Sequence, residues 1–211
     1  MISNENQSQL AFNQTIVLQM EGGDSNYWPE YLDKGPAQKL FEYLLENIPW
    51  HQDELTIYGR RVLAPRLSCW MADRGLSYSY SNHQLRPIAW DARVFEMKES
   101  IEHFTRESFN SVLINYYRNG KDSNGWHSDD EKELGPKPAI ASLSLGGERD
   151  FVLRRKQDHS DKIKLCLANG SLLMMRGDTQ RNWQHQVPKR AVAVPRINLT
   201  FRQILTGKPA E

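Results

Sequence analysis

Two histidines and one carboxylate have the types and the order that a mononuclear iron site uses. His127 and Asp129 stand two residues apart, and His185 follows far downstream. Two imidazoles and one carboxylate form the facial triad, which holds non-heme Fe(II) on one face and leaves the opposite face open. A His-x-Asp pattern alone is common by chance. The rest of the chain must therefore supply what such a metal needs.

The segment 195–202 has a polar residue at every second position. Alternate side chains of a strand share a face, so one face is predicted to carry Arg196, Asn198, Thr200 and Arg202. Two inward-facing arginines are costly to bury unless they meet an anion. Their Cα atoms lie about 20 Å apart at ~3.3 Å per residue. Their forked side chains can lean together over a small dicarboxylate.

The segment 111–117 has a similar arrangement. Leu113, Asn115 and Tyr117 are predicted to share one face, on which they supply an apolar wall, an amide and a phenol. These groups suit a keto-acid cofactor with a hydrophobic middle and polar ends. The apolar residues between them are predicted to pack into the other layer.

The surrounding elements predict a mostly β fold with flanking α-helices. Helical spacing follows Pro36 and Pro87, and predicts helices over residues 36–48 and 87–104. Segment 55–70 is predicted to be extended with a turn near Gly59, and the strict alternation of 76–81 predicts a strand. Later strands are predicted at Ser111–Tyr117, Ile140–Leu145, Phe151–Arg155, Ile163–Leu167, Ser171–Met175, Ala191–Val194 and Ile197–Leu205. Short strands at this spacing favour a barrel or a jelly roll over βαβ units.

Composition sets the limits for the whole molecule. With 211 residues, 39% of them hydrophobic, the chain can bury one substantial core. The net charge of +1 excludes a generally basic protein, so any nucleic-acid surface must be a local patch. We expect neither a membrane span nor a signal peptide. Cys69 and Cys166 suit a reducing compartment and are expected to be buried thiols. We therefore expect an intracellular protein, cytoplasmic if bacterial and nuclear if eukaryotic.

Five segments together resemble one known protein family. They are Leu113-Ile-Asn115-Tyr-Tyr117, His127-x-Asp129, Ser171-Leu-Leu-Met-Met175, His185 and Arg196-x-Asn198-x-Thr200-Phe201-Arg202. The combination resembles the AlkB family of Fe(II)- and 2-oxoglutarate-dependent nucleic-acid dealkylases. The resemblance is closest to the branch that repairs DNA methylated on base nitrogens, and covers residues 28–205. It implies a double-stranded β-helix (jelly roll) core with N-terminal helices packed on it.

The resemblance also implies domains and cofactors. Residues 1–25 lie outside it; they are rich in Asn, Gln, Ser and Gly, and we expect a polar, flexible N-terminal arm there. Helices and a nucleotide-recognition extension are expected at 26–110. The jelly-roll core is expected at 111–207, within one structural domain over 26–207. The implied cofactors are Fe(II), 2-oxoglutarate as co-substrate and O₂. His127, Asp129 and His185 are implied to bind the iron and form the catalytic centre. The residues implied to hold 2-oxoglutarate are Asn115, Tyr117, Arg196, Asn198 and Arg202.

Other positions are implied to contact the substrate. Glu131 stands where the family places an acidic residue against the exocyclic amine of the damaged base. Tyr78 and Tyr80 match an aromatic segment that stacks on or near the flipped base. Tyr58 and Arg66 belong to a segment resembling a hairpin that fills the gap left by that base, with Tyr58 as the wedge. The plainer alternatives are a solvated acidic cluster for Glu131 and ordinary core packing for Tyr78 and Tyr80.

Two further features bear on the substrate. Ser128 departs from the family, whose close members usually have a basic residue between the first His and Asp. This change is expected to leave the iron chemistry intact and to alter phosphate or base contacts. Basic residues on predicted loops flanking the site are expected to contact phosphates, or else to form a solvated face: Arg60, Arg61, Arg66, Arg154, Arg155, Lys156, Lys189 and Arg190.

The function implied is oxidative demethylation of 1-methyladenine and 3-methylcytosine in DNA, with release of formaldehyde, succinate and CO₂. Such a base must be flipped out or already single-stranded. We expect a monomer that acts on DNA, with RNA as a further partner. One alternative is an RNA demethylase, or a protein demethylase or hydroxylase, with the same chemistry. Another is a non-catalytic nucleic-acid-binding module, against which the intact triad and both arginines argue.

Overall fold

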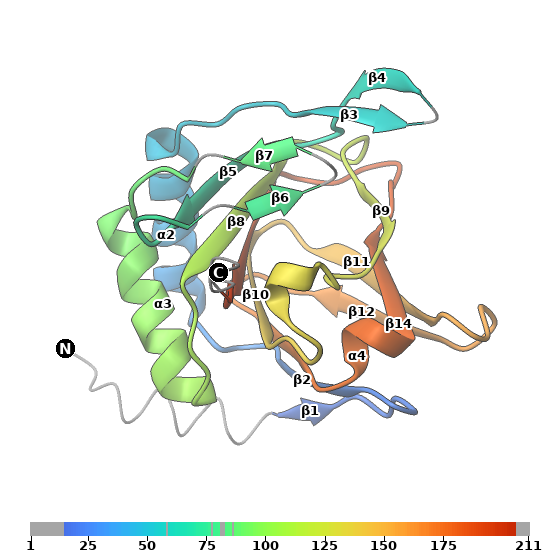
Figure 1. The fold of residues 1–211 in the computed structure, drawn as a ribbon. Coiled ribbons are helices and arrows are strands. Elements are labelled where there is room, and N and C mark those ends of the chain that lie inside the picture. Colours follow the sequence, from blue (N-terminus) through green and yellow to red (C-terminus); the bar gives the residue numbers. More distant parts are fainter. Residues whose placement is uncertain (1–14, 58, 77, 81–82, 86, 206–211) are drawn as a thin grey trace, which may run out of the picture.

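Two antiparallel sheets face each other in the computed structural model, which describes residues 15–57, 59–76, 78–80, 83–85 and 87–205 (Figure 1). The larger sheet has seven strands. In spatial order they are β1 (Ile16–Val17), β2 (Asp24–Trp28), β13 (Leu172–Arg176), β10 (Ile140–Gly146), β15 (Arg196–Arg202), β8 (Ser111–Tyr117) and β5 (Leu67–Ala72). The two strands with alternating polar residues, β8 and β15, are therefore neighbours inside this sheet.

The smaller sheet has four strands and lies opposite the larger one. Its order is β12 (Lys162–Leu167), β11 (Arg149–Arg155), β14 (Trp183–Val187) and β9 (Asn124–His127). Two short hairpins stand apart from both sheets, β3 (Glu54–Ile57) with β4 (Arg60–Leu63), and β6 (Tyr78–Tyr80) with β7 (His83–Leu85). A short 3₁₀ turn, η1 (Lys132–Leu134), follows β9, and α4 (Thr179–Asn182) precedes β14. The hairpins flank β5, the edge strand of the larger sheet.

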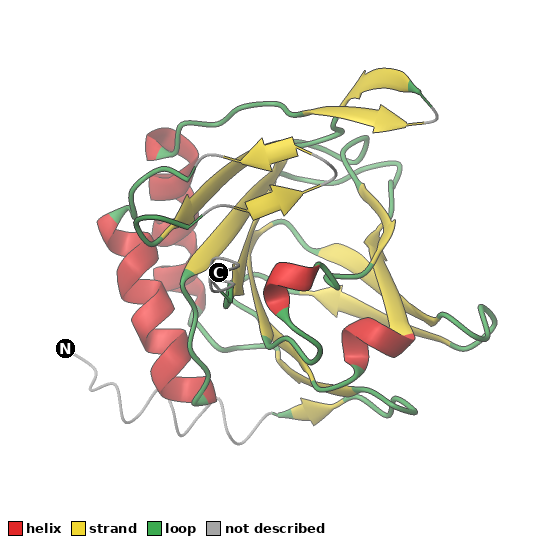
Figure 2. Ribbon diagram, viewed as in Figure 1, coloured by secondary structure: helices red, strands yellow, loops and turns green. Residues whose placement is uncertain are grey.

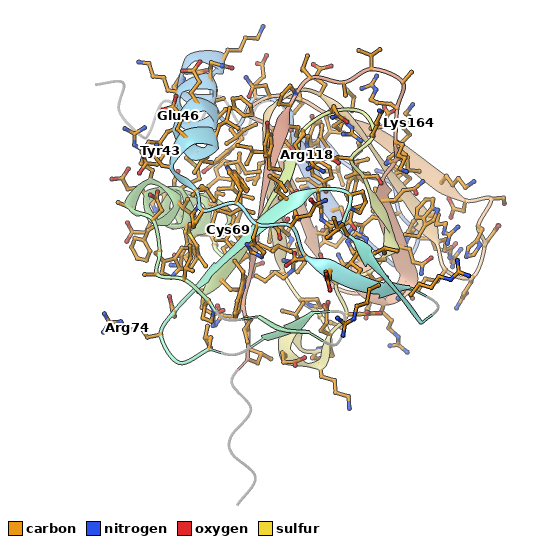
Figure 3. The ribbon with its side chains drawn as sticks, turned by 90° about the horizontal axis from the view of Figure 1, so that it is seen from above. Tyr43, Glu46, Cys69, Arg74, Arg118 and Lys164 are labelled. Atoms are coloured by element: carbon orange, nitrogen blue, oxygen red, sulfur yellow. The ribbon has the colours of Figure 1, made fainter. Side chains whose placement is uncertain are left out.

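Two helices cover the outer face of the larger sheet, as Figure 2 shows: α2 (Lys34–Asn47) and α3 (Ala92–Thr105). Their buried apolar residues recur at helical spacing, for example Leu40 and Leu44 on α2. In Figure 3, Tyr43 and Glu46 of α2 lie on one side of the molecule and Lys164 of β12 lies on the other. The larger sheet is thus sandwiched between the helices and the smaller sheet.

Alternation along β8 and β15 divides the interior into two cores. Ile114 and Leu199 point to the core beneath the helices, while Leu113 and Tyr117 point to the core between the two sheets. Each fully buried aliphatic side chain contributes about 1.5–3 kcal/mol to stability. The two cores therefore hold the sheets and helices together, and place the polar residues of β8 and β15 between the sheets. These features confirm the predicted mostly β fold with a jelly-roll core and packed helices.

Three expectations from the sequence need correction. The second helix begins at Ala92 rather than at residue 87, because the Asp91 side chain accepts hydrogen bonds from the first free backbone N–H groups and caps the helix there. No strand forms over the described residues 191–194, whose valines lie exposed in a loop. Cys69 is buried as expected, but Cys166 is exposed on β12.

Two strands of the smaller sheet were not predicted, and both carry metal-ligand candidates. β9 is rich in polar residues and Gly, and β14 alternates apolar residues with two glutamines. At the N-terminal end, β1 and the start of β2 fall within the arm expected over residues 1–25. The division into arm, extension and core stays a prediction. No helix in the described part of the chain is long and apolar enough to cross a membrane.

Candidate active site

His127, Asp129 and His185 meet between the two sheets. His127 ends β9, Asp129 follows in the next loop, and His185 is paired directly with His127 across the smaller sheet. Their ligand atoms all lie within 4.8 Å of one another. The two imidazole rings are 4.2 Å apart between centroids. Two adjacent strands and the loop after β9 therefore present a compact N, N, O donor set, as an Fe(II) facial triad requires.

The histidines are held in the neutral form that a metal needs. The carbonyl of Gly125 can only accept, so the 2.7 Å contact with His127 means that Nδ1 carries the proton. Nε2 is left as the ligand atom, within reach of the Asn124 amide at 3.2 Å. Burial lowers the pKa of His127, and burial together with the nearby His127 lowers the pKa of His185 to about 3. Both rings can therefore bind a cation without first losing a proton.

Asp129 is ionised despite being almost completely buried. Burial alone would raise its pKa, but the charge of Arg202 and the two neighbouring histidines hold that pKa at about 2. Arg202 donates from Nη2 to Asp129 Oδ1 over 2.8 Å. The site thus carries a fixed negative charge at its centre, which favours a cation.

The loop that carries Asp129 is fixed by two neighbours outside the triad. The side-chain oxygen of Gln180, on α4, accepts from the backbone N–H of Asp129 over 2.9 Å. Ser128 donates its hydroxyl proton to the carbonyl of Trp183 over 2.9 Å. That bond ties the His127–Asp129 segment to the start of the strand that carries His185. Ser128 therefore connects the ligand-bearing segments to each other.

A cavity extends from the triad between the sheets. Besides the triad, its lining includes the residues predicted for the cofactor and their neighbours on β8 and β15: Leu113, Asn115, Tyr117, Arg196, Asn198, Thr200 and Arg202. The strands are paired so that Asn198 lies opposite Asn115, and Arg196 opposite Tyr117. The structure therefore gathers all five residues predicted to hold 2-oxoglutarate along one wall of the cavity.

Arg196 is prepared to receive an anion. It is 1% exposed, and burial lowers its pKa to about 10, so it remains charged. Its Nη2 donates to the Ser144 hydroxyl over 2.8 Å, whereas Nε and Nη1 have no hydrogen-bond partner among the described residues. A buried guanidinium with free donors fits a carboxylate, which can accept two parallel hydrogen bonds.

Asn198 and Thr200 form a hydrogen-bonded polar surface of the cavity between the two arginines. Asn198 donates to Ser142 over 2.8 Å and accepts from Thr200 over 2.9 Å. Ser142 and Ser144 were not predicted, although their alternation within the otherwise apolar β10 was a usable signal. Gln180 gave no such signal, because its position on a four-residue helix cannot be inferred from spacing.

Arg66 lies beneath the cofactor strand rather than on the surface. It is 5% exposed, and its Nε donates to Oδ1 of Asn115 over 2.9 Å. A weaker contact of 3.4 Å reaches the carbonyl of Ser123 in the loop before β9. Arg66 does not line the cavity. These contacts orient Asn115, and the predicted role in substrate binding stays a prediction.

The remaining substrate candidates are placed only in part. Glu131 is half-buried at the start of η1, two residues beyond Asp129, and does not line the cavity. Tyr78 and Tyr80 belong to β6, but their side chains lie outside what the structure describes. Tyr58 also lies outside the described residues. Their contacts with a base stay predictions.

Several of the expected phosphate-binding residues already have partners within the protein. Arg155 forms an ion pair with Glu21, and Lys156 with Asp130. Arg154 stacks over Trp126 with its guanidinium carbon 4.1 Å from the ring centroid. The exposed members of the set are Arg60, Arg61, Lys189 and Arg190. Phosphate contact stays a prediction for the whole set, and these four exposed residues are the most accessible to a phosphate.

Comparisons with known proteins agree with this geometry. The family model described as the 2OG-Fe(II) oxygenase superfamily matches residues 24–202. The DNA oxidative demethylase ALKBH2 of Arabidopsis thaliana is 40% identical over 211 residues, covering 87% of this chain and 67% of the relative. The alpha-ketoglutarate-dependent dioxygenase alkB homolog 3 of Bos taurus is 42% identical, covering 83% of this chain and 64% of the relative. Human DNA oxidative demethylase ALKBH2 is 36% identical, covering 90% and 77%.

The chain thus spans about two thirds of the length of the plant and bovine relatives. A solved structure titled "The structure of OsALKBH1" superimposes with a TM-score of 0.56 at 16% identity, covering 89% of this chain and all of that one. At this identity the match shows the fold alone. The family model confirms the predicted cofactors, Fe(II), 2-oxoglutarate and O₂, and the donor set fits them. The chain belongs to the 2OG-Fe(II) oxygenase superfamily and, within it, to the AlkB family.

Proposed function

We propose that this protein is a DNA repair dioxygenase that oxidatively demethylates N-alkylated bases, with 1-methyladenine and 3-methylcytosine as substrates. The observation that carries this proposal is the cluster of half-buried His127 with buried Asp129 and His185, beside a cavity lined by Arg196 and Arg202. The similarity to proteins named DNA oxidative demethylase supports DNA as the substrate. Formaldehyde, succinate and CO₂ are the expected products.

The triad residues would hold the metal. When bound, Fe(II) with 2-oxoglutarate and O₂ supplies the oxidising chemistry that converts an N-methyl group into an N-hydroxymethyl group, which then loses formaldehyde. His127 Nε2, His185 and the Asp129 carboxylate already have the protonation states of metal ligands. Arg202 neutralises part of the charge on Asp129 and fixes the position of its carboxylate. The protein therefore contributes position and charge, and no acid–base group of its own is required.

The cofactor wall would fix the direction of 2-oxoglutarate. Arg202 contacts a metal ligand, so it lies at the end where the 2-oxo acid group would meet the metal. Arg196 starts the same strand and lies at the far end, where its free Nε and Nη1 suit the second carboxylate. Leu113 supplies the apolar middle between these ends. One dicarboxylate can therefore satisfy both arginines.

The methylated base would reach the metal only outside the base stack. We propose that the hairpins β3–β4 and β6–β7 receive the nucleic acid, since one precedes and the other follows the edge strand β5 in the chain, and the predicted substrate residues Tyr78 and Tyr80 belong to β6. Glu131 follows the metal loop closely enough for the same segment to inspect the base. A DNA substrate requires the compartment of the genome, which is the cytoplasm in a bacterium and the nucleus in a eukaryote.

The test is release of formaldehyde and succinate from methylated oligonucleotides in the presence of Fe(II) and 2-oxoglutarate. Single-stranded DNA, duplex DNA and RNA of the same sequence should be compared. We expect turnover on DNA that His127→Ala abolishes, while His103→Ala, at an exposed position of α3, retains it. Turnover on RNA alone would replace the DNA assignment. Equal activity of the His127→Ala variant would refute the metal assignment.

A further inference from the structure

Arg149 is a buried cation that the mechanism above does not use. It begins β11, is 0% exposed, and does not line the cofactor cavity. Its Nη2 donates to the carbonyls of Asp122 and Pro188 over 2.8 Å and 2.7 Å, and its Nη1 donates to that of Asn119 over 3.3 Å. Burying a charge is costly unless hydrogen bonds compensate it, and the three backbone carbonyls compensate Arg149. An apolar side chain would fill the same space without that cost, so the charge itself is expected to have a role.

The carbonyl groups that Arg149 binds belong to two loops at the same end of the cavity. Residues 118–123 leave β8 directly after Tyr117, and residues 188–195 lead directly into Arg196 at the start of β15. Tyr117 and Arg196 are opposite each other in the sheet. The loops also pack closely, because the N–H of Arg190 donates to the carbonyl of Gly120 over 3.0 Å. Arg149 therefore connects, through hydrogen bonds, the loop that follows Tyr117 with the loop that precedes Arg196.

Arg149 also acts on Tyr117 directly. Its guanidinium carbon lies 5.4 Å from the centroid of the Tyr117 ring, and that of Arg196 lies 5.2 Å from the same centroid. The phenol thus contacts two buried guanidinium groups, which limits its rotation. Two buried cations beside the same ring repel each other and attract an anion placed between or beside them. This end of the cavity, at Arg196, is the one farthest along β15 from the metal ligands.

We propose that Arg149 is a positioning residue for the second carboxylate of 2-oxoglutarate. It holds Tyr117 and Arg196 in place at their end of the cavity and adds positive potential there. Arg149 thereby contributes to the preference for a five-carbon dicarboxylic 2-oxo acid over shorter metal chelators. This inference rests on the proposed function, since it assigns the far end of the cavity to that carboxylate.

Binding measurements without turnover test the proposal. The full chain is loaded with Co(II) in the absence of O₂, and calorimetry measures its affinity for 2-oxoglutarate and for oxalate. Oxalate can chelate the metal but has nothing to place against Tyr117 and Arg196. We expect Arg149→Met to weaken 2-oxoglutarate binding about tenfold or more and oxalate binding less than about twofold. Arg149→Lys retains the charge but not the fork, and should fall between Arg149→Met and the wild type.

Two comparisons make the outcome decisive. Arg176→Met, at a half-buried arginine on β13 with its own partners in β2, should bind both ligands as the wild type does. In an Arg196→Met background, Arg149→Lys should cause a clearly smaller loss than in the wild type, because its effect passes through Arg196. If Arg149→Met does not fold, the test rests on this double-mutant cycle of Arg149→Lys and Arg196→Met.

Equal losses for both ligands, or no loss for 2-oxoglutarate, would overturn the proposal. Additive effects of Arg149→Lys and Arg196→Met would also overturn it. Failure of the wild-type protein itself to bind 2-oxoglutarate would instead refute the proposed function, so the two failures are distinguishable.

Discussion

Arg202 donates a hydrogen bond of 2.8 Å from Nη2 to Oδ1 of Asp129, and both side chains are buried. The bond joins the last residue of the cofactor strand β15 to the carboxylate of the metal cluster. The charge of Arg202 is also the largest single influence that lowers the pKa of Asp129. The metal site and the cofactor cavity therefore share one charged group, so a change in either is expected to affect the other.

Replacing Arg202 with Met should weaken both metal and cofactor binding. The carboxylate of Asp129 would lose its buried cationic partner and its fixed orientation. Loss of a partner of this kind typically lowers metal affinity about 10- to 100-fold. Titration of the metal-free protein with Co(II), followed by its visible absorption, measures the first effect. Calorimetry with 2-oxoglutarate measures the second.

Arg196→Met is the matched control for this prediction. Arg196 is a buried arginine on the same strand, but it contacts Ser144 rather than a metal ligand. Its replacement should weaken 2-oxoglutarate binding and leave Co(II) affinity unchanged. If both variants bound Co(II) as tightly as the wild type, the contact between Arg202 and Asp129 would have no role in metal binding.

Gln180 should support metal binding through the backbone of Asp129. Its buried side-chain oxygen accepts the N–H of Asp129, while its Nε2 donates only to the weak acceptor Sδ of Met175 over 3.5 Å. In Gln180→Met this buried N–H would lose its acceptor, and the loop that carries the carboxylate would gain freedom. We expect Co(II) affinity to fall about tenfold. Gln186→Met, at a half-buried glutamine of β14, should bind Co(II) as the wild type does.

The sequence predicted which residues of β8 and β15 share one face, because that face follows strand periodicity. Residues at every second position of β8 and β15 reach the same cavity, and local alternation is enough to find them. The metal ligands were predicted by residue type and order. Their strands were not predicted, because β9 is short and polar and pairs with β14 only through contacts distant in sequence.

The residues that sequence reasoning missed act through tertiary contacts. Arg149 lies outside the predicted strand Phe151–Arg155 and was not singled out, and only the fold brings it to the carbonyls of Asn119, Asp122 and Pro188. Arg66 is brought by the fold to Asn115, a contact that no local pattern indicated, and its predicted role at the substrate stays a prediction. Local patterns contain no information on which loops will meet, so such residues become visible only in three dimensions.

Asp122 should stabilise the protein in a pH-dependent way. Burial alone would raise its pKa, but hydrogen bonds from the side chain and backbone of Arg118 lower it below the ordinary value. The ionised form is therefore favoured by folding. Its stabilising contribution is fully present above the unfolded-state pKa of about 3.9 and is lost as the pH falls through the lower folded-state pKa. Asp122→Asn should reduce the free energy of unfolding by about 2 kcal/mol at pH 7.

Urea unfolding of Asp122→Asn and the wild type at several pH values checks the direction of this pH dependence. The difference in unfolding free energy should narrow as the pH falls below about 4. Asp150→Asn is the control, because Asp150 pairs with the largely exposed Lys164 and such pairs contribute about 0–1 kcal/mol. A difference for Asp122→Asn that stayed constant down to acidic pH would show that its charge is not what stabilises the loop.

Gly120 should be intolerant of any side chain, because it lies where the two loops joined by Arg149 meet. A Cβ at this position would stand 2.2 Å from the backbone oxygen of Arg190, which cannot move away like the end of a flexible side chain. Gly120→Ala should therefore destabilise the protein by about 1–3 kcal/mol and weaken 2-oxoglutarate binding, because the loops beside Tyr117 and Arg196 must separate.

Gly35→Ala is the control: an added Cβ in α2 meets nothing within 4 Å and should stabilise slightly. Thermal unfolding and calorimetry measure both effects. Normal 2-oxoglutarate affinity in a folded Gly120→Ala variant would show that the contact between these loops does not shape the cofactor cavity.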